Sequence, residues 1–286
     1  MPVEGIDVSI YQGTVDWTQV RASGRLFAIA KASDGSSTVD PRFAQNWAGI
    51  QGAGLLRGAY HYAHPGQDAA TQAAFFFSQF GSLGPGDLPP ALDLEQNDGQ
   101  SNDAVIAWAQ AFLQKLETLC GQTPIVYTGG FWKFQLGNPT VSSMGQSPLW
   151  LAQYATTFQC PNSWTAPTFW QYSGSGTVPG ISGNCDLDRF LGDESALRAM
   201  ANAPPTSDPG PVVWSRYLVW PSTPIMAGPD VVAWQTRANT LSAGLQVDGM
   251  YGSSSKYACQ VLQKHFGLTV DGIVGPKTWA ATFGTS

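Results

Sequence analysis

Short apolar segments recur along the first two thirds of the chain. A run of four to eight residues rich in β-branched and aromatic side chains, bounded by Gly, Pro, Asn or Asp, predicts a β-strand. Eight runs of this kind lie between residues 5 and 190, at Gly5–Ser9, Phe27–Lys31, Leu56–Tyr62, Ala91–Glu95, Ile125–Thr128, Leu149–Tyr154, Thr168–Tyr172 and Asp186–Phe190.

Between the first five strands the apolar residues change to helical spacing, which predicts helices at Asp16–Ala22, Pro41–Ala53, Asp68–Phe80 and Asn102–Cys120. Strands that alternate with helices predict parallel pairing. After the fifth strand only a short helix near Gly130–Leu136 fits, and the later intervals are short and rich in Pro, Gly and Ser. The expected fold is α/β: a TIM-like (β/α) barrel of eight strands and about five helices, with helices missing towards its end.

A Pro-rich segment separates this barrel from a smaller C-terminal unit. Asp193–Ala203 has the pattern of one more helix, and the Pro density of residues 204–211 predicts a stiff linker. We therefore expect a barrel domain at 1–203, a linker at 204–211 and a second domain at 212–286.

The second domain contains an internal repeat. The motif V-D-G-x-x-G occurs at 247–252 and again 23 residues later at 270–275. Helical patterns surround the two copies, at Asp230–Leu241, at Ser254–Phe266 and from Pro276 onwards. This pattern predicts a small all-α unit of three helices joined by tight Asp-Gly turns.

Composition limits the classes of function. With 43% hydrophobic and 12% charged residues, the chain is expected to be globular with large cores. A net charge of −6 and the lack of a basic stripe argue against a nucleic-acid partner. No apolar stretch reaches the ~18 residues that a bilayer requires, so no membrane insertion is expected. The start of the chain lacks the pattern of a secretory signal, so synthesis in the cytoplasm is expected.

The cysteines and histidines do not predict a metal site or a cofactor. The four Cys residues form no C-x-x-C knuckle and are interpreted as core thiols, with a Cys160–Cys185 bridge as the alternative in an oxidising milieu. His61 and His64 form an H-x-x-H. However, H-E-x-x-H is absent, and strand alternation turns His61 away from the tyrosines on either side of it.

Two carboxylates one residue apart, Asp93 and Glu95, lie in an otherwise apolar run. Residues i and i+2 of a strand share a face, so both acids point the same way. Close, partly desolvated carboxyl groups have pKa values that are pushed apart, which cleavage of a glycosidic bond requires. A D-x-E triplet by itself is more often a solvated loop or an ion-paired strand end.

Seven segments in order closely resemble glycoside hydrolase family 25, the Chalaropsis-type lysozymes: Gly5-Ile6-Asp7-Val8-Ser9, Gly58-Ala59-Tyr60-His61-Tyr62, Asp93-Leu94-Glu95, Tyr127-Thr128-Gly129, Leu149-Trp150-Leu151-Ala152-Gln153-Tyr154, Trp170-Gln171-Tyr172 and Asp186-Leu187-Asp188. The resemblance covers roughly residues 3–192. It implies an incomplete-helix barrel with N-acetylmuramidase activity on peptidoglycan. Residues 212–286 resemble the three-helix peptidoglycan-binding module of cell-wall hydrolases, although Trp214–Met226 is unusual for it.

The resemblance also implies catalytic roles. Glu95 would be the general acid that protonates the glycosidic oxygen between N-acetylmuramic acid and N-acetylglucosamine and then activates water. Asp93 would stabilise the oxocarbenium charge or orient the substrate N-acetyl group for attack; a covalent intermediate on Asp93 or Asp7 is less favoured. Asp7 and Asp186 would complete the acidic cluster and help keep Glu95 protonated.

Further residues are candidates for binding substrate: Tyr60, Tyr62, Tyr127, Trp150, Gln171 and Asp34. Rings would stack on sugars and the amide would bond an N-acetyl or hydroxyl group, although each could equally belong to the barrel core. The Asp-Gly pair at Asp34 is also ordinary turn chemistry. Asp188 is a weaker candidate than Asp186, with the alternative of a surface partner for Arg189.

A muramidase with a wall anchor and no export signal resembles a bacteriophage endolysin, made in the host cytoplasm and acting on the wall after release. A bacterial autolysin with another export route is an alternative. A chitinase-like glycosidase is disfavoured because the D-x-x-D-x-D-x-E spacing is absent. A non-catalytic wall-binding protein is disfavoured because every acid used by the family is present. We expect a monomer.

Overall fold

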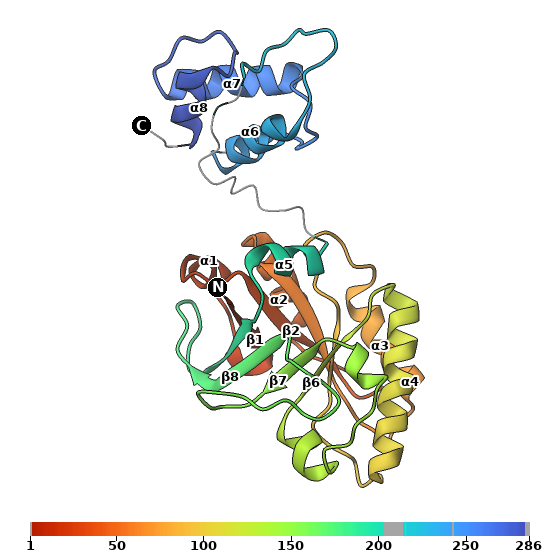
Figure 1. Cartoon of the computed structure of the whole chain (residues 1–286). Helices are drawn as coiled ribbons and strands as arrows, with labels where there is room; N and C mark the ends of the chain where they lie inside the picture. The colour runs from red at the N-terminus through yellow and green to blue at the C-terminus, as the bar shows by residue number, and fades with distance from the viewer. Residues whose placement is uncertain (1, 203–213, 215, 242, 284–286) are drawn as a thin grey trace. The chain divides into compact units, whose positions relative to one another are not determined.

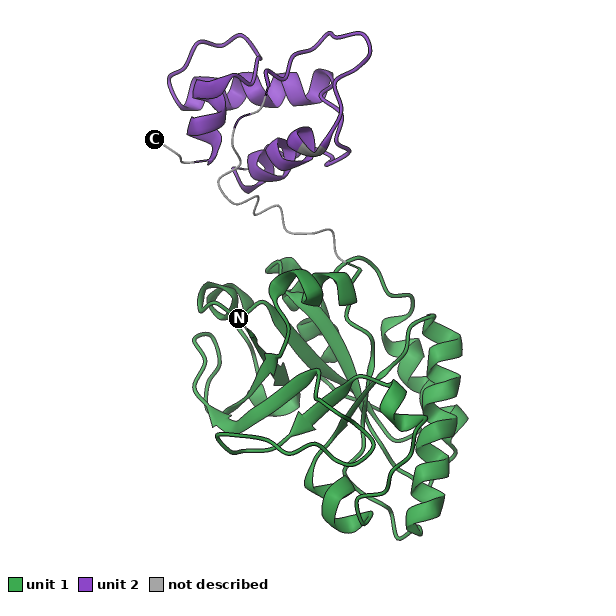
Figure 2. Ribbon diagram, viewed as in Figure 1, with its two compact units in different colours: residues 1–205 green, residues 206–286 purple. Residues whose placement is uncertain are grey.

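The computed structural model describes residues 2–202, 214, 216–241 and 243–283 (Figure 1). The chain divides into two compact units, residues 1–205 and residues 206–286 (Figure 2). The linker predicted at 204–211 lies outside the described residues.

The first unit is a closed barrel. Its strands are β1 (Val3–Val8), β2 (Phe27–Asp34), β4 (Leu56–Tyr62), β5 (Ala91–Asp93), β6 (Ile125–Thr128), β7 (Leu149–Ala152), β8 (Phe169–Gly176) and β9 (Cys185–Phe190). The sheet order β1-β9-β8-β7-β6-β5-β4-β2 closes through pairing of β1 with β2, which confirms the predicted eight-stranded barrel. The short strand β3 (Thr38–Val39) pairs antiparallel with β2 outside this ring.

The last barrel strand runs in the opposite direction to the others. The pairs from β1–β2 through β7–β8 around the barrel are parallel, whereas β9 is antiparallel to both β8 and β1. Parallel pairing was expected for the strands that alternate with helices, and those strands are parallel; β9 does not follow a helix and is antiparallel. The physical reason is the connection at 177–184, which contains no helix and is too short for the crossover that a parallel neighbour requires.

Helices cover the barrel along the first part of the chain. They are α1 (Trp17–Ala22), α2 (Phe43–Gly52), α3 (Ala69–Phe80), α4 (Asn102–Cys120) and, after the last strand, α5 (Glu194–Met200). Side chains of Asp16, Asp68, Ser101 and Asp193 accept a backbone N–H at the start of α1, α3, α4 and α5, which explains where these helices begin. The predicted helix near Gly130–Leu136 is a single turn of π-helix at Phe131–Gln135. No helix lies at 153–168, as expected for the end of the barrel.

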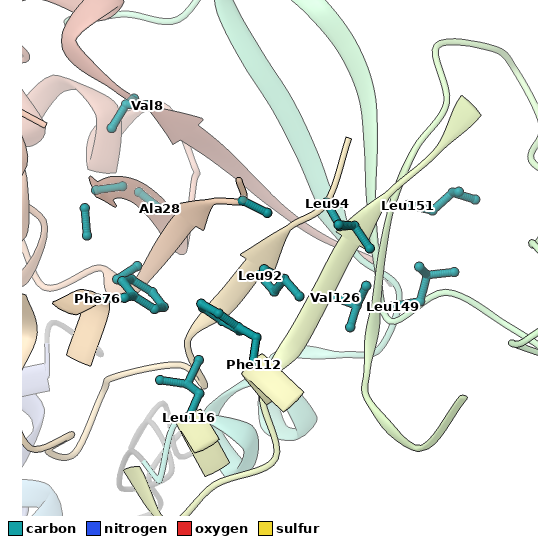
Figure 3. Close-up of a cluster of buried hydrophobic side chains, with 14 of the residues drawn as sticks. Val8, Ala28, Phe76, Leu92, Leu94, Phe112, Leu116, Val126, Leu149 and Leu151 are labelled. Atoms are coloured by element: carbon teal, nitrogen blue, oxygen red, sulfur yellow. The ribbon is translucent and has the colours of Figure 1, made fainter. Parts of the chain in front are cut away.

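Strand alternation divides the core into two layers. Outward-facing residues of β5, β6 and β7, including Leu92, Val126 and Leu149, pack towards Phe76 of α3 and Phe112 of α4 (Figure 3). The alternate residues fill the inside of the barrel, among them Ile29, Ala91, Ile125, Trp150 and Phe169. Residues of the inner set that lie near one end of the strands therefore face a common space.

The second unit is small and helical, as predicted. Its helices are α6 (Pro229–Thr240), α7 (Ser253–His265) and α8 (Pro276–Phe283), with a core that includes Trp234, Tyr251 and Leu262. Among the described helices of both units, none combines the length and apolarity needed to cross a membrane. The four cysteines are free thiols, so the Cys160–Cys185 alternative is not observed.

Candidate active site

A cavity of about 550 Å³ opens at the end of the barrel where the parallel strands finish. Its wall contains every residue that the sequence predicted for the site: Asp7, Asp34, Tyr60, Tyr62, Asp93, Glu95, Tyr127, Trp150, Gln171 and Asp186. Asp186 reaches this end because β9 is antiparallel, so its first residues, and not its last, lie beside the end of β1, where Asp186 is the partner of Asp7.

The acid pair lies where β5 ends. Asp93 is the last residue of the strand, is buried, and lies between Tyr62 of β4 and Tyr127 of β6 in register. Leu94 packs outwards in the core beneath the helices, so Asp93 and Glu95 both face the cavity. Leu94 N donates to Tyr127 O at 3.0 Å, and the Thr128 hydroxyl donates to Leu94 O at 2.9 Å, so two hydrogen bonds fix the chain between the two acids.

The two acids differ in their environment. Burial raises the pKa of Asp93 well above its usual value, and the charge of Glu95 adds to this effect. Asp93 Oδ1 has no hydrogen-bond partner among the described residues. Glu95 is exposed in the cavity, yet the surrounding walls desolvate it enough to raise its pKa; Lys31 opposes this rise and Asp186 adds to it. Glu95 is therefore an acid that can hold a proton and that a ligand in the cavity can reach.

A second acidic group lies on β1 and β9. Gln171 Nε2 donates to Asp7 Oδ2 at 2.7 Å, and Trp150 Nε1 donates to Asp188 Oδ1 at 2.8 Å. Burial, then the charges of Asp188 and Asp186, raise the pKa of Asp7 well above its usual value. Burial also raises the pKa of Asp188 to about 7.

Asp188 is fully buried, so the alternative that it is a surface partner of Arg189 was wrong. Arg189 instead pairs with Glu4 at 2.7 Å. Strand alternation explains the difference, because Asp188 belongs to the inner set of β9 and its neighbour Arg189 to the outer set.

The aromatic residues form a floor and a rim. Tyr127 and Trp150 pack edge to face with ring centroids 4.7 Å apart, and both are buried. Their rings therefore build the floor of the cavity and leave little face open to a ligand. Tyr154, which is 62% exposed, lies at the rim and, like Tyr127, donates to Gln171 Oε1 at 2.9 Å. Gln171 thus connects both tyrosines to Asp7.

The cavity wall also contains a cation, Lys31. Lys31 Nζ is 2.8 Å from Asp34 and 4.6 Å from the centroid of the Tyr62 ring, and His64 Nε2 is 2.9 Å from Asp34. Partial burial would raise the pKa of Asp34, but hydrogen bonds and charges of Lys31 and His64 hold it below its usual value. Asp34 is therefore a partner of these bases as well as part of the cavity wall.

The side chains of the two histidines of the H-x-x-H motif, His61 and His64, have different surroundings. The ring nitrogens of His61 lie 2.9 Å from Ser33 Oγ and 2.9 Å from Gln72 Oε1, in the core outside the barrel, and burial lowers its pKa to about 4. His64 contacts Asp34 and Asp98. The prediction that strand alternation separates His61 from the site residues is confirmed.

Five further residues line the cavity that sequence reasoning did not include among the site residues: Ser9, Tyr11, Gln12, Lys31 and Tyr154. Lys31 had a usable signal, because it continues the inner alternation of Phe27 and Ile29. Tyr11 is 87% exposed on a 3-10 turn at Ile10–Gln12, and only the fold shows that this turn borders the cavity.

Comparison with known proteins finds a matching family for each unit. The family described as glycosyl hydrolases family 25 matches residues 6–181, and the peptidoglycan binding domain family matches residues 227–281. The chain is similar to an autolytic lysozyme of Clostridium acetobutylicum, with 34% identity over 282 residues that cover 98% of this chain and 78% of the relative.

Two solved structures share the barrel. A bacterial lysozyme from Streptomyces coelicolor has 34% sequence identity and a TM-score of 0.67, over 71% of this chain and 98% of that chain. The CTP1L endolysin has 27% identity and a TM-score of 0.55, over 70% of each chain.

Proposed function

Because the chain belongs to the family 25 glycosyl hydrolases and carries a peptidoglycan-binding domain, we propose that it is a muramidase that cleaves the β-1,4 bond between N-acetylmuramic acid and N-acetylglucosamine. That it is a glycoside hydrolase of the bacterial cell wall follows from the family. The gathering of Asp7, Asp93, Glu95 and Asp186 around one open cavity supports acid-catalysed hydrolysis of a glycosidic bond. The likeness to an N,O-diacetylmuramidase of Chalaropsis, with 32% identity over 202 residues, supports the choice of bond.

Glu95 is the proposed proton donor. It is the exposed member of the acid pair, its pKa is raised, and protonation of the glycosidic oxygen requires an acid that substrate can reach. In the second half of the reaction the ionised Glu95 accepts a proton from the attacking water.

Asp93 is proposed to act on the charge that develops at the sugar ring. Its carboxyl group forms part of the cavity wall, where it can meet a substrate N-acetyl N–H or the oxocarbenium charge. These two roles, and the less favoured covalent intermediate on Asp93 or Asp7, differ in which atom attacks the anomeric carbon.

The test is digestion of purified peptidoglycan by the wild type and by Glu95→Gln. We expect new reducing ends on N-acetylmuramic acid, identified by mass spectrometry, and a rate lower by ~10³-fold in the variant. Glu117→Gln, an exposed glutamate of α4, is the matched control and should leave the rate unchanged. Reducing ends on N-acetylglucosamine would contradict the bond assignment, and an undiminished rate in Glu95→Gln would contradict the role of Glu95.

For the biological setting we propose host lysis by a phage, with the protein made in the host cytoplasm and acting on the wall after release. The likeness to the CTP1L endolysin supports this setting, and the likeness to an autolytic lysozyme supports the bacterial alternative. Expression inside a susceptible bacterium should cause lysis only after the membrane is permeabilised. Lysis of intact cells with the enzyme recovered from the medium would contradict the proposal.

We also propose that the protein acts as a monomer, since each unit has its own core. Light scattering during gel filtration should give the mass of one chain. A mass of two chains that persists on dilution would refute this.

A further inference from the structure

The two V-D-G-x-x-G turns of the second unit are held by the same buried clamp. Gln235 Nε2 donates to Asp248 Oδ1, Met250 O and Ser255 Oγ at 2.8, 3.0 and 3.1 Å, and its Oε1 accepts from Gly249 N at 2.9 Å. Gln263 repeats these four bonds with Asp271, Ile273, Thr278 and Gly272, at 2.7, 3.0, 3.1 and 2.9 Å. The two turns therefore have equivalent hydrogen bonds to a buried glutamine.

What differs is the chain packed beside the second turn. Leu218 and Val274 exchange both backbone hydrogen bonds, at 3.2 and 3.0 Å, and thereby fix the segment before α6 along this turn. The Tyr217 ring lies on Gly275 so closely that a Cβ at Gly275 would be 2.8 Å from it. The match to the peptidoglycan-binding domain begins at residue 227, so Tyr217 is an addition to the matched module.

Tyr217 forms one wall of a cavity of about 500 Å³ at the second turn. The cavity also contains Thr269, Asp271 and Lys277, and the Tyr217 ring remains 55% exposed. Lys277 is in the first turn of α8, where unpaired backbone N–H groups favour anions, and it forms no ion pair with any described residue. The cavity thus offers an aromatic face, a free cation and an exposed carboxylate.

The corresponding hollow at the first turn has an exposed aromatic ring, that of Tyr257, but its described lining includes neither a cation nor a carboxylate. It has about 370 Å³ and is lined by Ala243, Gly244, Leu245, Ser253, Ser254, Tyr257 and Ala258. Within the described chain, no charged side chain and no residue of the segment before α6 contributes to it. The two turns therefore differ in their cavities: the second has charged residues and Tyr217, and the first, as far as it is described, has neither, so the first serves as an internal control.

We propose that the second-turn cavity, completed by Tyr217, is the site where this unit binds peptidoglycan, and that it takes the stem peptide rather than the glycan. The proposal rests on the wall-directed function above and names the part of the polymer that is bound. A peptide terminus supplies a carboxylate for Lys277 and α8, and a backbone or ammonium donor for Asp271. An N-acetylated sugar is neutral and would leave the Lys277 cation without a partner.

The experiment uses the full chain carrying Glu95→Gln, so that binding is measured without cleavage. Isothermal titration with the tetrapeptide L-alanyl-γ-D-glutamyl-L-lysyl-D-alanine and with N-acetylglucosamine tetrasaccharide compares the two parts of the polymer. We expect peptide binding that Tyr217→Ala and Lys277→Gln each weaken at least tenfold. Tyr257→Ala, a 70% exposed tyrosine at the first turn, should have no effect.

Loss of binding in Tyr257→Ala equal to that in Tyr217→Ala would overturn the proposal, and so would binding of the tetrasaccharide alone. Tyr217→Phe retains the ring and should still bind the peptide, which distinguishes a lost contact from a misfolded unit. Loss of peptide binding in Tyr217→Phe, with a native circular dichroism spectrum, would also contradict the proposed site. An inactive wild-type enzyme would refute the muramidase assignment and leave this measurement intact.

Discussion

Replacement of Asp188 by Asn should stabilise the barrel in a pH-dependent way. The Asp188 carboxylate is fully buried on the inner face of β9, where Trp150 Nε1 donates to its Oδ1 and its other neighbour is the Asp7 carboxyl, which can hydrogen-bond to it only when one of the two acids is protonated. Burial raises the pKa of Asp188 from the ordinary 3.8 to about 7. That interval corresponds to about 4 kcal/mol by which folding disfavours the ionised form, and the nearby Asp7 carboxyl makes this an upper value.

The sign follows from where each state titrates. Below pH 3.8 Asp188 is protonated in both the folded and the unfolded chain, so it costs nothing. As pH rises from 3.8 through about 7, the unfolded chain ionises first and the folded state loses relative stability. Asn cannot ionise, yet it keeps a carbonyl oxygen for Trp150 Nε1. We therefore expect a gain of up to about 4 kcal/mol at pH 8 and little change at pH 4.

The assay is urea unfolding of the full chain at pH 4, 6 and 8, followed by tryptophan fluorescence. Asp103→Asn is a suitable control because Asp103 is exposed in the first turn of α4, and its small effect should not grow between pH 4 and pH 8. A gain of equal size at all three pH values would refute the reasoning, because it would show that packing and not ionisation separates the variants. A loss of stability at pH 8 would refute it as well.

Three other perturbations test the site and the fold. Lys31→Met removes the charge that lowers the pKa of Glu95, so the alkaline limb of the pH–rate profile, where Glu95 loses its proton, should move to higher pH; an unmoved limb would argue against Glu95 as the acid. Gly5→Ala places a Cβ 2.3 Å from the Phe27 ring and should lower the free energy of unfolding in urea by about 1–3 kcal/mol. The Cβ of Gly52→Ala meets no atom within 4 Å, so this control should leave the free energy of unfolding unchanged. Equal effects of the two substitutions would contradict the packing argument. Gln263→Ala removes the hydrogen bonds that hold the second turn and should destabilise the C-terminal unit by about 1–3 kcal/mol, measured as a lower midpoint of thermal unfolding. Gln235→Ala should lower the midpoint by a similar amount, and a large difference between the two variants would show that the turns are not equivalent.

Much of the barrel could be predicted because its elements carry local signals. The apolar runs match the observed strands within a few residues, and α4 occupies Asn102–Cys120 as its spacing predicts. Inner-face alternation also brings Asp93 and Glu95 to one cavity. The same alternation points Lys31, a polar residue that follows Phe27 and Ile29 on the inner face, into the cavity.

Other features had no local signal. The reversal of β9 depends on the length of the connection before it and on the gap left by the other strands, and it decides that Asp186 lies at the cavity. Likewise, Trp150 resembles a sugar platform in sequence, but the closed barrel buries its ring and leaves it as floor.

The sequence by itself determined the order of strands and helices, the repeat of the second unit and the residues on each strand's inner face, because these follow from local composition and from spacings of two or 3.6 residues. The family followed from the resemblance of seven segments to glycoside hydrolase family 25. Only the tertiary structure decided which acids are buried and which are open, how Gln171 joins Asp7 to two tyrosines, and that Tyr217 lies on Gly275 of the second turn. Desolvation and contact between residues far apart in sequence depend on how the chain closes on itself, and no local pattern encodes that closure.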